Sequence, residues 1–392
     1  MKRSMLHCRS CGAVYDADAV FRCACGEPLD LDWTESGIDE DGRDLPSRYG
    51  AFFPFEPGEW LSLGEGNTPL VPLSRLAGEL GLSSLVVKNE SANPTWSFKD
   101  RGTAACIAHA RALGFTRVGT VSTGNMAASV AAYGAAAGLE TVILVKGDLA
   151  EEKMAPIAIY GPRLIRVQGA YDGLYAESIR IGAERGIYFM NSDVPFRVAG
   201  SRTIAFEIFE QTDGCLPDWV IVPTSAGGNI RGIINGFMDL KAAGLADRIP
   251  GFICAQAAGC SPIATAFARS DEHISPFPAP HTIAHAIENP FPPSGNRVLL
   301  ELRSRTWHAL AAPEDEIVRA QADMARSGLF GQPAAAVPLA TLRQARAKGI
   351  VKEGERVALV FTGSGLKYTA AFASHRLHWE DCGLEELEER LK

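Results

Sequence analysis

The chain has 392 residues, of which 46% are hydrophobic and 21% are charged, and its formal net charge is −8. This is the composition of a globular protein large enough for two domains. The acidic balance excludes the basic face that nucleic-acid binding needs, and no apolar run reaches the roughly 20 residues that cross a bilayer. Because no apolar segment follows the basic N-terminus, we expect no secretory signal and a cytoplasmic location.

Nine cysteines occur in the chain, and four of them lie near its start: Cys8, Cys11, Cys23 and Cys25. Two thiol pairs on short turns, each followed by glycine, have the ligands of a tetrahedral zinc site. The second pair has one residue between its cysteines where two are commoner, so a small ribbon of reduced thiols is the alternative. Four cysteine ligands leave no open position for catalysis, and this segment is therefore predicted to be structural.

Residues 31–60 are rich in acidic residues, glycine, proline and aromatics, and we expect a connector across the main body. Strands and helices alternate after it, which predicts parallel sheets covered by helices, in two α/β lobes with a cleft between them. The predicted strands are 85–90, 118–122, 141–145, 164–167, 219–223, 251–255 and 357–361. The predicted helices are 98–113, 125–137, 153–160, 171–185 and 229–243.

Residues 93–102 read Asn-Pro-Thr-Trp-Ser-Phe-Lys-Asp-Arg-Gly and place Lys99 in the first turn of a helix, with Ser97 as its predicted cap. The positive end of the helix dipole disfavours a cation there and lowers the pKa of the amine. Such a lysine forms Schiff bases with carbonyl compounds and pyridoxal phosphate. The alternative is a surface lysine beside a solvated pair, Asp100 and Arg101.

Four polar loops follow predicted strands, where ligands bind in open α/β sheets. Residues 122–127 and 223–229 each precede a helix and present backbone amides that suit an anion, although Ser122 or Thr123 is an alternative local cap. Residues 361–367 follow the last strand. Residues 191–197 contain Asn191 and Arg197, and arginine offers a bidentate fork for phosphate.

Residues 93–102 resemble the Asn-Pro-Thr-Gly-Ser-Phe-Lys-Asp-Arg-Gly segment of threonine synthases, which are fold-type-II pyridoxal-phosphate enzymes. Residues 65–70 and the four polar loops resemble further segments of the same family in the same order, and so does the cysteine ribbon. The resemblance implies a two-lobed α/β fold like that of the tryptophan synthase β subunit, with a ribbon at residues 1–35. It also implies a large cofactor-binding domain (36–103 and 194–392), a small α/β domain (104–193) and a homodimer.

The resemblance assigns roles residue by residue. Lys99 would bind pyridoxal phosphate and act as the catalytic base. The remaining cofactor ligands would be Asn125, Thr362 at the pyridine nitrogen, and the phosphate loop Thr224, Ser225, Ala226, Gly227, Gly228 and Asn229. The substrate would contact Ser97, Thr123, Gly124, Asn125 and Met126, with Asn191 and Arg197 on its phosphate and Lys153 as a weaker candidate.

Three positions depart from the family pattern. Trp96 stands where the family has glycine, His285 where it has threonine, and residues 332–336 begin with Gln332 in place of glutamate. We expect Trp96 and His285 to face the substrate. The implied reaction is the conversion of O-phosphohomoserine and water to threonine and phosphate. The alternatives are a β-replacement synthase like cysteate synthase, which takes O-phosphoserine and sulfite, a threonine or serine dehydratase, and a non-catalytic homologue.

Overall fold

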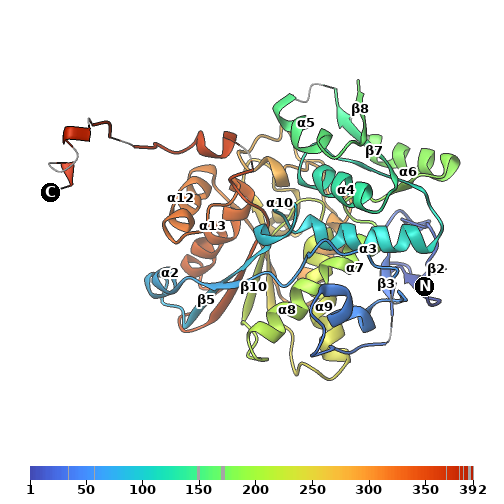
Figure 1. Ribbon diagram of the computed structural model, residues 1–392. Coiled ribbons are helices and arrows are strands. Elements are labelled where there is room, and N and C mark those ends of the chain that lie inside the picture. Colours follow the sequence, from blue (N-terminus) through green and yellow to red (C-terminus); the bar gives the residue numbers. More distant parts are fainter. Residues whose placement is uncertain are drawn as a thin grey trace.

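The computed structural model describes residues 1–33, 35–56, 58–147, 151–168, 173–367, 369–378, 380–382, 384–386 and 390–391. Its first 32 residues form a small antiparallel sheet in the order β2-β1-β3, made of β1 (Met5–His7), β2 (Val14–Asp16) and β3 (Asp30–Asp32). The four N-terminal cysteines lie in the turns of this ribbon, which packs beside α7 (Pro195–Ser201) and is drawn in dark blue in Figure 1.

The larger sheet has six strands in the order β12-β11-β10-β13-β5-β4. Its strands are β4 (Leu70–Pro72), β5 (Ser84–Asn89), β10 (Trp219–Pro223), β11 (Gly251–Ala257), β12 (His308–Ala312) and β13 (Arg356–Phe361), and only β4 pairs antiparallel among them. The interiors of the central strands β10 and β13 are aliphatic, because both faces of the sheet are covered. Val220 and Val222 point into one core, whereas Ile221 between them points into the other.

Helices cover the two faces of this sheet (Figure 1). One core also holds residues of α8 (Thr203–Gln211), α9 (Gly228–Ala242), α10 (Pro262–Arg269) and α11 (Gly295–Ser304). The other core holds residues of α2 (Ser74–Glu79), α12 (Glu314–Arg326) and α13 (Pro333–Ala347). Short 3-10 turns are η2 (Glu90–Ala92), η3 (His285–Ile287), η4 (Thr369–Phe372) and η5 (Leu384–Glu386). No helix in the described part of the chain is long and apolar enough to span a membrane.

The smaller sheet is parallel, in the order β8-β7-β6-β9. It is made of β6 (Arg117–Val121), β7 (Glu140–Lys146), β8 (Arg163–Val167) and β9 (Tyr188–Phe189), with α4 (Asn125–Ala136), α5 (Glu151–Ala158) and α6 (Leu174–Arg185) around it. The long helix α3 (Lys99–Ala112) packs against both α4 and α7 and so joins this part to the larger one. The predicted alternation of strands and helices is confirmed, and the described element ends differ from the predicted ones by at most three residues. Residues 171 and 172, at the start of the predicted helix 171–185, lie outside the described residues.

The predicted connector has more structure than its composition indicates. It contains β3, the helix α1 (Leu45–Tyr49) and the 3-10 turn η1 (Gly50–Phe52). Phe52 and Phe53 are buried, and the ring of Phe52 lies 4.2 Å from that of Phe206 in α8. Aromatic packing rather than a regular hydrophobic period therefore fixes this segment on the body, which is why a pattern search misses it.

Candidate active site

A cavity of about 570 Å³ lies at the carboxyl ends of β6, β10 and β13, so both larger sheets contribute to its wall. Four helices, α3, α4, α9 and α13, begin at this wall, and none of the four has a side-chain cap at its N-terminus. Their uncapped amides and dipoles make the cavity electropositive. Lys99, Lys153, Arg197 and Glu288 also line it, so the charged side chains favour an anionic ligand.

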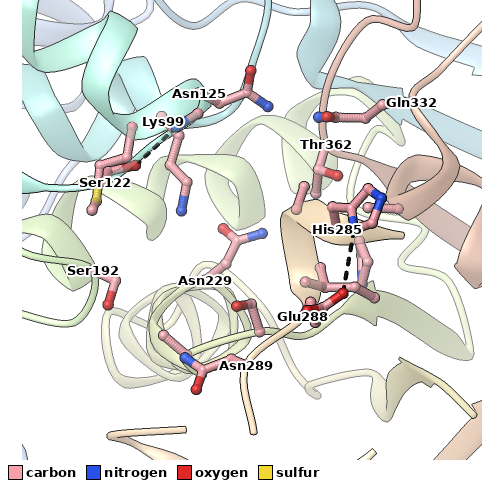
Figure 2. A pocket seen from close by; sticks show the side chains of 18 of the residues that line it. Lys99, Ser122, Asn125, Ser192, Asn229, His285, Glu288, Asn289, Gln332 and Thr362 are labelled. Atoms are coloured by element: carbon pink, nitrogen blue, oxygen red, sulfur yellow. Dashed lines mark hydrogen bonds and ion pairs between the residues drawn. The ribbon is translucent and has the colours of Figure 1, made fainter. Parts of the chain in front are cut away.

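Lys99 is the first residue of α3, and its side chain points into the cavity (Figure 2). The Nζ atom lies 4.4 Å from the centre of the Phe98 ring. Burial, and after it the positive charge of Arg197, lower the pKa of Lys99 to about 7. A substantial fraction of the amine is therefore neutral and nucleophilic near pH 7, as a Schiff-base lysine needs to be.

The predicted cap of this helix is wrong. Phe98 occupies the N-cap position without a side-chain bond, and the Ser97 hydroxyl is buried without a hydrogen-bond partner among the described residues. The Asp100 carboxylate instead accepts hydrogen bonds from the backbone N–H and the hydroxyl of Thr95, at 2.7 and 2.6 Å. Asp100, in the first turn of α3, therefore holds the preceding loop at Thr95, and it is not a solvated residue.

Arg101 is not solvated either. Its guanidinium is fully buried and bonds to the carboxylates of both Glu90 and Glu207. Lys88 also bonds to Glu207, at 2.6 Å. This ion network connects η2, α3 and α8. Arg101, two residues after Lys99, therefore helps to fix the position of the helix that carries the lysine.

Arg197 is 4% exposed and forms no ion pair with any residue that the structure describes. Its Nε and Nη2 atoms donate to the carbonyl of Met190, and Nη1 donates to the hydroxyl of Thr103 at 3.1 Å. Gly102 permits this arrangement, because a Cβ atom there would come within 2.7 Å of the Arg197 side chain. The close crossing of α3 and α7 thus holds a buried cation at the wall of the cavity, with no counter-ion among the described residues.

The loop between β10 and α9 contributes Thr224, Ser225, Ala226, Gly227, Gly228 and Asn229 to the cavity. Gly227 has a φ of +94°, a conformation that favours glycine. The Asn229 side chain is buried, and neither its oxygen nor its nitrogen has a hydrogen-bond partner among the residues that the structure describes. Buried polar atoms are rarely left unpaired, so this loop is built to receive a polar ligand.

The loop between β6 and α4 lines the opposite wall with Ser122, Thr123, Gly124, Asn125 and Met126. The Ser122 hydroxyl accepts a 3.3 Å bond from the N–H of Gly124, which precedes the helix. The alternative in which Ser122 or Thr123 caps the helix is therefore wrong, and the first turn of α4 keeps its amides for a ligand. Thr362, at the end of β13, completes the cavity across from this loop (Figure 2).

Three of the residues assigned to the substrate do not line the cavity: Ser97, Trp96 and Asn191. The Asn191 amide is buried, where it accepts a bond from the N–H of Val121 and donates one to Ser178. Trp96 is 53% exposed and has a φ of +64°. This backbone conformation explains why the related segment has glycine there, and for tryptophan it costs about 1–2 kcal/mol.

The other two departures do reach the cavity. His285 lies on η3, and its Nδ1 atom is 3.3 Å from the Glu288 carboxylate (Figure 2). Gln332 lies at the N-cap of α13 beside Gly363, where a Cβ atom would come within 2.4 Å of its Nε2. Sequence reasoning gave no role to several polar or small lining residues, among them Ser192, Ser201, Glu288, Asn289, Ala370, Ala373 and Ser374. The last three come from the segment after β13, which carries no motif.

The four N-terminal cysteines converge. Their Sγ atoms all lie within 4.8 Å of one another, with 3.7 Å between Cys8 and Cys25 and 3.5 Å between Cys11 and Cys23. Ligands at about 2.3 Å from a tetrahedral zinc ion are about 3.8 Å apart, so the cluster has the size of a zinc site. No other group of three or more possible metal ligands occurs among the residues searched.

An amine-bearing cleft between two α/β lobes, ringed by helix N-termini and a glycine loop, defines an enzyme of the fold-type-II class. The sequence model of the family described as "Pyridoxal-phosphate dependent enzyme" matches residues 61–363. The chain is 38% identical over 372 residues to the threonine synthase of Methanocaldococcus jannaschii and 36% identical over 372 residues to that of Methanosarcina acetivorans. Each alignment covers 92% of both chains. The chain belongs to the pyridoxal-phosphate dependent enzymes, in their threonine synthase-like group.

Solved structures agree on the fold. Maize serine racemase matches with a TM-score of 0.66 at 21% identity, covering 83% of this chain and 92% of its own. An O-ureido-L-serine synthase matches with a TM-score of 0.65 at 21% identity, covering 80% of this chain and 95% of its own. The cavity fits the cofactor of this family, because the unpaired Asn229 amide and the uncapped start of α9 suit its phosphate and the Lys99 amine suits its aldehyde.

Proposed function

We propose that this protein is a threonine synthase, which converts O-phosphohomoserine and water to threonine and phosphate. One observation carries the proposal. Lys99, whose pKa is lowered, and Arg197, which is buried and has no ion-pair partner in the described part of the chain, share one cavity. A dehydratase that releases water has no use for a second phosphate site. The two archaeal threonine synthases similar over 92% of the chain support the same reaction.

Pyridoxal phosphate, bound at Lys99, would supply the electron sink that stabilises negative charge on the substrate's α-carbon. Residues 224–229 would hold its phosphate at the start of α9, and Asn125 and Thr362 would contact its ring. Thr362, which lines the cavity, would offer a neutral hydroxyl to the ring nitrogen. A hydroxyl leaves that nitrogen largely unprotonated, which suits elimination and replacement at Cβ or Cγ.

The residues of the chain then have separate tasks. Lys99 would remove the α-proton, since its lowered pKa leaves a neutral amine to accept it. The first turn of α4, with Thr123, would bind the substrate carboxylate. Arg197 would bind the leaving phosphate, and Lys153, which also lines the cavity, would be a weaker second candidate. Asn191 would act indirectly, because its backbone carbonyl accepts a 3.1 Å hydrogen bond from the Nε atom of Arg197.

A β-replacement synthase acting on O-phosphoserine is the second candidate. His285 and Gln332 favour it, because both differ from the family pattern and both reach the cavity. A second anionic nucleophile such as sulfite would find a polar wall there. The same lysine and arginine would serve either reaction.

The remaining assignments concern the zinc site, the domain boundaries, the location and the oligomeric state, and they follow from the resemblance to threonine synthases. The cysteine cluster would hold a structural zinc ion, since its size suits one. The chain would divide at residues 35, 103 and 193 into ribbon, large domain and small domain, and it would act as a cytoplasmic homodimer.

Phosphate release separates these functions. We would incubate the purified holoenzyme with O-phosphohomoserine and with O-phosphoserine, each with and without sulfite or sulfide, and identify the amino-acid product. Release from phosphohomoserine with threonine as product is the expected result. Release from phosphoserine alone, or only with an added nucleophile, would establish the second candidate. A Lys99→Ala protein with full turnover and the absorption band of a lysine-bound cofactor would refute both.

A further inference from the structure

Arg22 connects the cysteine ribbon to the wall of the active-site cavity. Its Nη1 atom donates a 2.7 Å hydrogen bond to the carbonyl of Gly26, within the turn that carries Cys23 and Cys25. Its Nη2 atom donates to the carboxylate of Asp193 at 2.6 Å and to the carbonyl of Pro293 at 2.9 Å. One guanidinium therefore holds the ribbon turn and two loops of the catalytic body together.

Asp193 depends on this contact. It is 1% exposed, and Arg22 is its ion-pair partner among the residues that the structure describes. Its carboxylate also accepts hydrogen bonds from the hydroxyls of Ser294, at 2.8 Å, and Tyr175. A buried carboxylate that loses its cation is strongly destabilised, so the position of Asp193 is tied to Arg22.

Asp193 and Ser294 enclose the glycine loop that precedes α9. The N–H of Ser294 donates to the carbonyl of Ala226 at 3.0 Å. A Cβ atom on Gly227 would lie 2.9 Å from the Cβ of Ser294, and one on Gly228 would lie 3.4 Å from the Cα of Asp193. A Cβ atom on Gly228 would also come within 2.7 Å of the backbone oxygen of Ser192, next to Asp193, so these neighbours leave the loop little room to move.

A second connection reaches the same point. Arg231, on α9, donates to the Ser294 hydroxyl at 2.9 Å and to the carboxylate of Asp30, in β3, at 2.7 Å. The ribbon thus reaches Ser294 both through Arg22 and Asp193 and through Asp30 and Arg231. All five of these side chains lie outside the cavity lining and none contacts the reacting groups.

We propose that Arg22 is a positioning residue for the glycine loop, so that the cysteine ribbon sets the affinity of the active site for pyridoxal phosphate. The proposal rests on the assignment of the cofactor phosphate to residues 224–229. The Arg22 guanidinium also donates a hydrogen bond to the carbonyl of Gly26. A change in the positions of the cysteines would therefore move Arg22 and, through it, the glycine loop. A distortion of the cluster then loosens the cofactor site without touching a catalytic residue.

Cofactor affinity is the direct test. Holoenzyme is dialysed against a series of pyridoxal phosphate concentrations, and the band of the lysine-bound cofactor gives the Kd. We expect Arg22→Ala to raise this Kd roughly tenfold, or about 1.4 kcal/mol, and Arg22→Lys to raise it less. Asn235→Ala is the matched control, because it removes a 2.9 Å bond between α9 and Asp30 but leaves Asp193 and Arg22 in place.

An unchanged Kd in both Arg22 variants would overturn the proposal. An equal rise in Asn235→Ala would also overturn it, because the cause would then be looser ribbon docking. Arg22→Lys keeps a cation beside Asp193 and so remains informative if Arg22→Ala fails to fold. The readout is cofactor binding, so a protein that binds pyridoxal phosphate but leaves phosphohomoserine intact would refute the proposed reaction and not this inference.

The link from the cluster is tested with the exposed ligand Cys11. Cys11→Ser should raise the Kd for pyridoxal phosphate in the wild-type background and add little to Arg22→Ala, because both changes act on one path. Equal effects of Cys11→Ser in the two backgrounds, or no effect in either, would show that the cluster does not act through Arg22.

Discussion

The lowered pKa of Lys99 predicts that this lysine destabilises the apoprotein. Its pKa falls from an ordinary 10.5 to about 7, because burial and Arg197 disfavour the ammonium form. Between these two values the unfolded chain binds a proton that the folded chain does not, so the stability of the apoprotein rises with pH across this window. At pH 7 the full shift corresponds to about 4 kcal/mol of lost stability.

Replacement by an apolar side chain of similar length, Lys99→Met, removes this cost. Water in the open cavity screens the ammonium, so we expect a gain of about 2 kcal/mol at pH 7 that shrinks to less than about 1 kcal/mol near pH 9.5. The measurement is urea unfolding of the two apoproteins at both pH values. Lys241→Met, at an exposed position on α9, is the control and should give no gain.

One result of the urea unfolding experiment would refute this reasoning. If Lys99→Met and wild type unfold at the same urea concentration at both pH values, Lys99 is an ordinary solvated lysine. The argument that its environment prepares it as a nucleophile would then be wrong, even if it binds the cofactor.

Three further variants test the cavity and its support. Arg197→Gln should raise the KM for a phosphorylated substrate about 10- to 100-fold with a smaller change in kcat, because a charge-assisted bond is lost; an unchanged KM would remove the phosphate from this residue. Gly227→Ala should weaken pyridoxal phosphate binding, measured by its absorption band, because alanine is strained at a φ of +94° and meets Ser294; normal binding would contradict the loop assignment. Glu207→Gln should destabilise the protein by about 3–5 kcal/mol in urea unfolding, because Arg101 and Lys88 lose their shared carboxylate. Although burial opposes them, Arg101 and Lys88 lower the pKa of Glu207 to about 2, so the difference from wild type should vanish as pH falls from about 4.5 to 2; a pH-independent difference would exclude this origin.

The sequence predicts the fold well, because the strands and the loops that follow them are both marked by short local patterns. Aliphatic runs mark the strands β6, β10 and β13, and a glycine or asparagine after each run marks the loops that line the cavity. Side-chain direction is less accessible to prediction. Asn191 belongs to a substrate-binding motif, yet its amide bonds to the N–H of Val121, a partner fixed only when β6 and β9 pair.

The misplaced helix cap has a comparable cause. A serine two residues before Lys99 is a reasonable cap by propensity, but Thr95 and Asp100 already close the loop from within. The segment after β13, whose Ala370 and Ser374 line the cavity, offers no pattern at all, since small residues acquire a role there only through position. Such features depend on tertiary contacts that no short window of sequence contains.

In the proposed reaction, one cavity would serve a lysine and three anionic groups. Burial and, after it, the charge of Arg197 lower the pKa of Lys99, and the same arginine and the helix N-termini would attract the phosphate of the cofactor and the carboxylate and phosphate of the substrate. Each bound anion would offset part of this positive charge, so the basicity of Lys99 would rise as the site fills. In the proposed reaction, Lys99 would therefore be most nucleophilic in the empty site and most basic when the substrate is bound. A cation at a helix N-terminus, which is unfavourable by itself, would be useful there because anionic ligands offset the cost.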